Sequence, residues 1–209
     1  MKKITTLLFT LAFCTTAFAE DQAFVTHGGW EHTASSAYED SWTGSVRYEH
    51  RLYRELWVAP EYTYHGPMEH HTGEDDSPFN YGDVSGHSVL VDLIYYPEWA
   101  RIKKVEPYLI GGAGWSFWEF KESQQVSDLG VSVALGDSFV YKVGVGSTYQ
   151  ISPRCELIIE WSFFKSDVPK TATNADGSES ILLGDDNKHG HITIGEEETR
   201  LTAGLRFSW

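Results

Sequence analysis

Apolar and polar residues alternate with a period of two along most of this chain, which is the spacing of a β-strand with one apolar and one polar face. In the segment 138–151, for example, Tyr141 and Val143 oppose Lys142 and Gly144. No helical period fits the clearest of these segments. The alternation predicts eight strands, over residues 23–33, 42–52, 55–64, 86–96, 105–119, 138–151, 155–164 and 198–209.

The connections between these strands differ in length in a regular way. Tight turns are expected near Arg54, 97–104 and 152–154. A short polar stretch covers 35–41, and longer polar segments occupy 65–85, 121–137 and 166–197. In an up-and-down sheet every second connection lies at the same end, so the long loops share one end and the short turns share the other. The sequence therefore predicts an all-β fold, an eight-stranded antiparallel up-and-down barrel.

Composition narrows the functions that such a barrel can have. The chain of 209 residues carries 16 Lys and Arg against 30 Asp and Glu, which gives a net charge of −14. Such a chain is repelled by phosphates, so nucleic acid is excluded as a partner. Aromatic residues make up 14% of the chain, more than a disordered acidic segment contains, so we expect it to fold.

The first 19 residues have the order of a cleaved secretory signal. Lys2 and Lys3 precede an apolar run, and the segment ends on Ala17, Phe18 and Ala19. The run is shorter than the ~20 apolar residues that a spanning helix requires. We therefore expect residues 1–19 to be a signal peptide that is cleaved after export through the Sec pathway, and residues 20–209 to form one barrel domain.

An exported barrel is either soluble, with an apolar interior, or embedded in a membrane, with an apolar exterior and a polar lumen. The aromatic residues distinguish the two, because they gather at the ends of the apolar faces: Trp42, Tyr62, Tyr64, Tyr95, Trp115, Phe117, Phe139, Tyr141, Tyr149, Trp161, Phe163, Phe207 and Trp209. Two aromatic girdles around an aliphatic middle are typical of a face that lies in lipid. The strands are therefore predicted to be transmembrane strands.

Three features give the mature chain a resemblance to a known group. A glycine-lined strand covers 107–115, the strand after it contains Lys142-Val143-Gly144-Val145-Gly146, and the chain stops on Phe207-Ser208-Trp209. With these features the sequence resembles the small outer-membrane barrels of Gram-negative bacteria, the OmpA, OmpX and OmpW-like group. The resemblance implies a location in the outer membrane. It also implies that Phe207 and Trp209 form the signal that the outer-membrane assembly machinery reads.

The polar faces of the strands carry charges that would lie in the lumen of such a barrel. They are Arg47, Glu49, Arg51, Glu61, Asp92, Lys142, Glu156, Glu160, Arg200 and Arg206. An eight-stranded barrel is just wide enough for side chains to fill it, and charges buried there must be paired. We expect these ten residues to form a salt-bridged lumen network. The alternative is a gated pore in which one ion pair exchanges partners to admit small solutes.

The long loops are rich in acids and histidines, among them Glu69, Asp83, Glu197, His65 and His70. Carboxylates suit Ca²⁺ or Mg²⁺ and imidazoles suit Zn²⁺, but no fixed ligand spacing is present. We therefore expect a hydrated loop surface, with no metal site and no cofactor. Divalent cations that bridge the acids to lipopolysaccharide phosphates are an intermediate possibility.

These features favour a non-enzymatic outer-membrane barrel, with no catalytic residues, that serves surface interaction, envelope integrity or limited passage of small solutes. The alternative is a lipid A-modifying hydrolase, which needs a serine, a histidine and a carboxylate near the outer rim. Its candidates are His87 with Ser85 or Ser88, and Asp83. A further alternative is a soluble exported barrel that binds an apolar ligand.

Overall fold

The computed structural model describes residues 21–33, 40–72, 79–128, 130–166, 168–174, 192–194 and 197–209. The predicted signal peptide, together with most of the loop acids and histidines, lies outside these residues or outside the side chains that are placed. Within the described part of the chain, no helix combines the length and the apolar character needed to cross a membrane.

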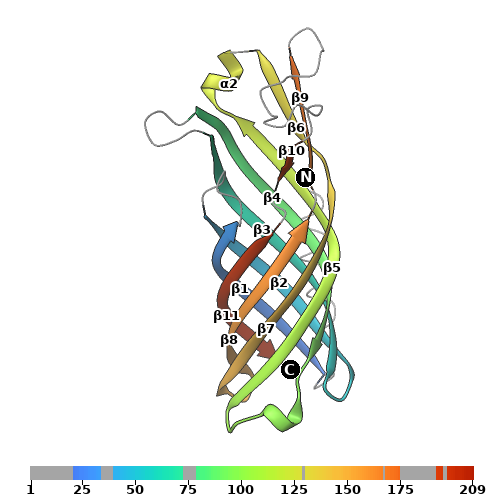
Figure 1. Ribbon diagram of the computed structural model, residues 1–209. Coiled ribbons are helices and arrows are strands. Elements are labelled where there is room, and N and C mark those ends of the chain that lie inside the picture. Colours follow the sequence, from blue (N-terminus) through green and yellow to red (C-terminus); the bar gives the residue numbers. More distant parts are fainter. Residues whose placement is uncertain are drawn as a thin grey trace.

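Eight antiparallel strands close into a barrel, which confirms the predicted fold class (Figure 1). The strands are β1 (Gln22–Thr33), β2 (Ser41–Tyr53), β3 (Leu56–Thr72), β4 (Phe79–Tyr95), β5 (Val105–Glu122), β7 (Ser138–Ser152), β8 (Cys155–Ser166) and β11 (Glu198–Ser208). Each pairs with the next barrel strand along the chain, and β1 pairs with β11 to close the sheet. No edge strand is left in the barrel, so its backbone groups are paired within the sheet.

The connections lie at two distinct ends of the barrel. The turns at 53–56 and 152–155 and the segment 95–105, which contains the short 3₁₀ helix η1 (Glu98–Ala100), lie at one end beside the C-terminus, here called the turn end. The tight turn between β2 and β3 places Arg54 at a positive φ of 40°. The longer connections lie at the opposite end, here called the loop end (Figure 1).

The predicted long loops contain a helix and strands that the alternation pattern does not predict. Helix α2 (Gln124–Asp128) and strand β6 (Val131–Leu135) follow β5, while β9 (Val168–Asn174) and β10 (Ile192–Ile194) follow β8. Strands β6, β9 and β10 form a separate three-stranded sheet above the barrel. The loop predicted over 65–85 is wrong for most of its length, because β3 continues to Thr72 and β4 begins at Phe79.

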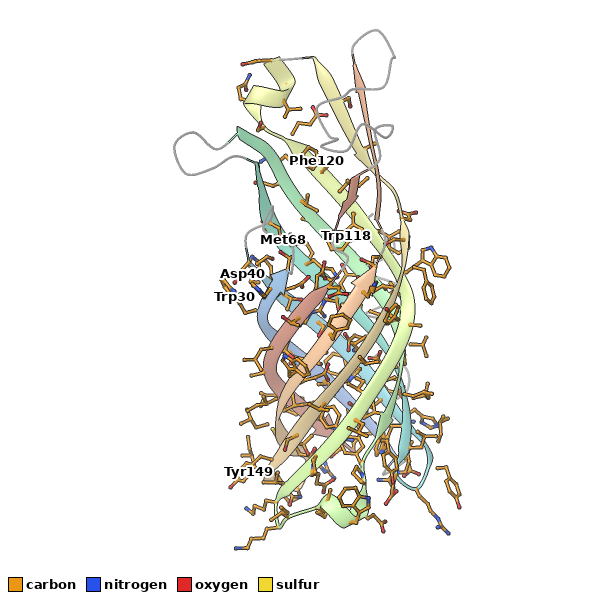
Figure 2. All side chains as sticks on the ribbon, in the orientation of Figure 1. Trp30, Asp40, Met68, Trp118, Phe120 and Tyr149 are labelled. Atoms are coloured by element: carbon orange, nitrogen blue, oxygen red, sulfur yellow. The ribbon has the colours of Figure 1, made fainter. Side chains whose placement is uncertain are left out.

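The β3–β4 hairpin extends beyond the end of β2, and apolar side chains line the inner side of the part whose side chains are described. Strand β2 pairs with β3 only as far as His65, whereas the pairing of β3 with β4 continues to Thr72. Met68, Val84 and Trp118 pack together on the inner side of this extension. Figure 2 shows Met68 and Trp118 toward the loop end and Tyr149 at the opposite end. The acids and histidines of this segment conceal its apolar positions in the sequence.

The outer face of the barrel carries large apolar side chains. Aromatic side chains near the loop end are exposed, namely Trp30, Trp42, Phe117, Phe139 and Tyr141, as are those near the turn end, namely Tyr53, Tyr95, Tyr149, Phe207 and Trp209. Exposed aliphatic side chains lie between them, namely Val46, Val89, Val91, Val143, Val145, Ile159 and Leu201, and Trp161 is exposed beside Val145 and Leu201. This is the two-girdle arrangement of a lipid-facing surface. It argues against the soluble-barrel alternative, whose exterior would be polar.

The lumen is filled by side chains arranged in layers, which can be followed along β4. From the turn end to the loop end its inward positions include Ile94, Asp92, Leu90, Ser88 and Val84, all buried completely. Ile94 belongs to an apolar cluster at the turn end, Leu90 to a second cluster with Val140 and Phe164, and Val84 to a third near the loop end. Asp92 and Ser88 belong to polar layers between these clusters, and these polar layers are the candidate functional site.

Candidate functional site in the lumen

The polar layer nearer the turn end joins six strands through ion pairs. Its members, here called the central network, are Arg47, Glu49, Glu61, Asp92, Lys142, Glu156, Glu160 and Arg206. They come from β2, β3, β4, β7, β8 and β11, so the layer crosses the lumen from wall to wall. The period-two alternation of each strand directs these side chains inward.

Arg47 lies at the centre of this network. Its guanidinium contacts Glu160 at 2.8 Å, Glu49 at 3.0 Å and Glu61 at 3.4 Å, and its side chain is fully buried. A planar guanidinium presents five donors in fixed directions, so it can serve several carboxylates at once. Removal of Arg47 would leave three carboxylates short of a partner.

Lys142 joins the opposite wall of the barrel to the same carboxylates. Its Nζ donates to Asp92 Oδ2 at 2.6 Å and to Glu61 Oε2 at 2.8 Å, and it lies 3.9 Å from Glu160. Both partners and the lysine are buried, so salt and water screen these pairs only weakly. A buried charge without a partner costs several kcal/mol, and Lys142 is therefore required once Asp92 and Glu61 are buried.

Arg206 extends the network toward the turn end. Its guanidinium donates to Glu49 at 2.7 Å and to Glu156 at 2.9 Å. It also lies over the rings of Trp57 and Tyr96, with centroids 4.9 and 5.5 Å away. Cation–π contact with a buried ring stabilises a charge that has left water. The apolar cluster at the turn end therefore covers the central network and also supports it electrostatically.

Tyr108 connects the apolar cluster to the network and explains the glycine at position 146. The Tyr108 hydroxyl donates to Glu160 Oε2 at 2.9 Å. Its ring lies against Gly146, and a Cβ at that position would overlap the ring. Gly146 therefore makes room for an aromatic side chain in the lumen.

A second polar layer lies nearer the loop end and is here called the His65 cluster. It consists of Glu31, His65, Ser88, Glu198 and Arg200. His65 Nδ1 lies 2.9 Å from Glu31 Oε1, and His65 Nε2 lies 2.7 Å from Ser88 Oγ. Arg200 contacts the other oxygen of Glu31 at 3.4 Å. Phe164 separates the two layers, because the Arg200 guanidinium lies 3.7 Å from its ring centroid and Lys142 Nζ lies 5.7 Å from it.

The ten residues predicted to form one lumen network do not all lie together. Eight of them make up the central network, and Arg200 belongs to the His65 cluster. Arg51 lies outside both: it is exposed at the turn end, where it pairs with Asp21 at 2.8 Å and stacks on Trp57. Arg51 still pairs with Trp57 in register, but it lies two residues before the end of β2, where the barrel opens at the turn end.

Of the five members of the His65 cluster, Arg200 alone is among the residues predicted for the lumen network. His65 is predicted to lie in an outer loop, but it follows Glu61 and Thr63 on the inward side of β3, and all three are buried. Glu31 lies in the segment 23–33, where the two faces are hard to distinguish in the sequence. Glu198 stands on the polar face of the last segment together with Arg200. Continuing the alternation of 55–64 by one step would have placed His65 in the lumen.

The residues considered for a lipid A-modifying hydrolase do not assemble. His87 faces outward, where its Nδ1 lies 2.5 Å from the Tyr62 hydroxyl, whereas Ser88 points into the lumen. Ser85 and Asp83 share the outward side with His87, but among the described residues no side-chain hydrogen bond joins either of them to His87. The pairing of His87 with Ser88 is excluded by the strand's alternation.

A different hydroxyl–imidazole–carboxylate arrangement is formed by Ser88, His65 and Glu31. Hydrogen-bonded groups of this kind activate the nucleophilic serine of some hydrolases. A second hydroxyl, that of Ser116, lies 2.8 Å from Ser88 Oγ. All of these side chains are at most 1% exposed. A lipid ester in the membrane cannot reach a serine enclosed in the lumen, so this arrangement serves internal hydrogen bonding in the structure described here.

Comparison with known proteins gives the fold an independent reference. No protein-family model and no curated protein match the chain. Among solved structures, Neisserial surface protein A is 14% identical, with a TM-score of 0.57 over 91% of this chain and 98% of that one. OprG from Pseudomonas aeruginosa is 11% identical, with a TM-score of 0.61 over 90% and 96%. A major outer membrane protein from Thermus thermophilus is 14% identical, with a TM-score of 0.61 over 90% and 99%.

At these identities the likeness concerns the fold. The chain has the fold of the small outer-membrane barrels, which confirms the resemblance inferred from its strands, its glycine-lined segment and its aromatic terminus.

Proposed function

We propose that this protein is a non-enzymatic barrel of the bacterial outer membrane whose lumen is closed to solutes and which acts through its outer surface, in surface interaction or envelope integrity. The observation that supports this proposal is that side chains fill the lumen. Arg47, Lys142 and their carboxylate partners occupy the cross-section of the barrel, and none of the partners Glu49, Glu61 and Asp92 is more than 3% exposed. An eight-stranded barrel filled in this way has no room for an aqueous channel.

The apolar outer face supports the membrane location. Its exposed aliphatic band would cost free energy in water at roughly 25 cal/mol per Å² of apolar surface, whereas lipid accommodates it. The expected result is that the protein fractionates with the outer membrane and migrates differently in gels before and after boiling, because a barrel without edges resists detergent. Intact protein in the periplasmic soluble fraction would contradict the membrane location.

The proposed partners follow from this location. The outward aromatic side chains at both ends of the barrel would contact outer-membrane lipid, and the acidic loops would meet lipopolysaccharide through divalent cations that bridge carboxylates and phosphates. The terminal Phe207 and Trp209 would be read by the outer-membrane assembly machinery during insertion.

Conductance across a planar bilayer tests the closed lumen. The refolded wild-type protein is expected to insert without stepwise current, because the ion pairs of the central network seal the barrel. The comparison is a variant in which Lys142 and Asp92 are both replaced by serine. This change removes one ion pair and replaces two large lumen side chains with small ones. Discrete steps from the wild-type protein would overturn the closed lumen and favour passage of small solutes.

A further inference from the structure

We propose that the His65 cluster binds one divalent transition-metal ion, Zn²⁺ in the first instance, through His65, Glu31 and Glu198. One ligand atom from each of these three residues lies within 4.8 Å of the other two, and all three residues are buried. The proposal concerns the interior of the barrel, and it is independent of where the protein acts and of whether its lumen conducts.

The distances between the ligand atoms suit a metal ion. Zn²⁺ binds nitrogen and oxygen ligands at about 2.0–2.2 Å, so two ligands on one tetrahedral ion lie about 3.3–3.5 Å apart. His65 Nδ1 lies 2.9 Å from Glu31 Oε1, slightly closer than that and within reach of a small side-chain adjustment. The donor set of one imidazole and two carboxylates is a combination that zinc accepts.

The residues around the three proposed ligands make hydrogen bonds like those that orient the ligands of known metal sites. Ser88 Oγ lies 2.7 Å from His65 Nε2, so it can accept a hydrogen bond from the Nε2 proton and leave the Nδ1 lone pair directed at the carboxylates. A metal-bound histidine commonly donates its other ring proton to such a partner. Arg200 contacts Glu31 Oε2 and also lies 3.4 Å from His65 Nδ1, so an ion held by Nδ1 and Glu31 Oε1 would displace the guanidinium from Nδ1 while its contact with Oε2 remains.

The buried side chains of the lumen carry an excess of negative charge that a bound cation would neutralise. Among the described residues, six buried carboxylates (Glu31, Glu49, Glu61, Asp92, Glu160 and Glu198) face four buried bases (Arg47, Lys142, Arg200 and Arg206). One divalent ion cancels this excess of two negative charges. A carboxylate oxygen of Glu198 lies within 4.8 Å of one of Glu31, and both residues are buried. Two buried carboxyl groups this close to each other are stabilised by a shared proton or by a cation between them.

The test measures zinc bound by the refolded full-length mature protein after equilibrium dialysis against zinc chloride. The variants are Glu198→Gln and His65→Gln. The matched controls are Glu197→Gln, at the exposed neighbour of Glu198, and His27→Gln, at a buried lumen histidine outside the cluster. All five proteins keep the remaining loop acids and histidines, so the difference between them isolates the cluster. Heat-modifiable gel migration verifies that each variant has folded.

The wild-type protein and both controls are expected to hold one more zinc ion per chain than the two cluster variants. Zinc is also expected to raise the unfolding temperature of the wild-type protein and not that of Glu198→Gln, because an ion that binds the folded state alone stabilises it. Substituting cobalt for zinc should give visible absorption bands that His65→Gln lacks. Equal zinc content in all five proteins would overturn the proposal, and so would a wild-type protein that binds none, since the carboxyl groups would then be balanced by protons.

Discussion

At the scale of single residues, each charged side chain in the lumen would be unfavourable there if it were buried without a partner of opposite charge. Burial of Lys142 or Asp92 alone costs several kcal/mol, and mutual pairing within a low-dielectric space offsets this cost. The two are linked at 2.6 Å, and the same ammonium group also contacts Glu61. The stability of each residue in the lumen therefore depends on its partners being present.

Replacing Lys142 by methionine tests this dependence. Lys142→Met keeps most of the length of the side chain but leaves Asp92 without its ion-pair partner and Glu61 with Arg47 alone. We expect it to lower the free energy of unfolding by about 3–5 kcal/mol. The measurement is urea-induced unfolding in lipid vesicles, followed by tryptophan fluorescence.

The control is Lys165→Met on β8. Lys165 is partly exposed and pairs with Glu197 at 3.7 Å, so its loss should cost less than about 1 kcal/mol. The double variant Lys142→Met/Asp92→Asn should recover part of the stability lost by Lys142→Met, because it removes one of the carboxylates left unpaired. Equal stability of Lys142→Met and the wild type would show that the network is not energetically coupled.

At the scale of the elements, most of the barrel could be predicted from the sequence because alternation reports directly which face of a strand is apolar. Strands β7, β8 and β11 are examples, since each alternates over nearly its whole length. The outer halves of β3 and β4 could not be predicted, because histidines and acids conceal the inward positions of Met68 and Val84. The central network followed from the polar faces. The His65 cluster did not, since it depends on the extension of β3 and on contacts between residues far apart in the chain.

The last strand carries a prediction of its own. Phe207 pairs with Phe24 of β1 and with Cys155 of β8, and the Trp209 amide donates to the Gln22 carbonyl at 3.3 Å, so the terminus takes part in closing the barrel. Deleting Trp209 leaves the lumen layers intact. We expect it to lower the amount of assembled protein in outer membranes far more than the stability of protein refolded in detergent, with Trp209→Phe restoring assembly. Immunoblots of membrane fractions check this, and normal levels without Trp209 would contradict it.

At the scale of the whole molecule, the barrel has an apolar outside and a polar, closely filled inside. This inverts the arrangement of a soluble protein, whose apolar side chains face inward. The fold is stabilised by lipid on one face and by ion pairs and small apolar clusters on the other. Both proposals depend on this assignment of faces, since a closed lumen and a buried metal site exist only inside the barrel.

Two tryptophans test the assignment most directly, because Trp57 is 5% exposed inside the lumen and Trp161 is 51% exposed on the outer face, between Val145 and Leu201. The measurement is fluorescence quenching of two proteins that each retain one of these tryptophans, with the other seven replaced by phenylalanine, refolded into bilayers with brominated acyl chains. We expect bromine to quench Trp161 strongly and to leave Trp57 nearly unchanged. Strong quenching of Trp57, or none of Trp161, would contradict the account of an apolar face in lipid around a polar lumen.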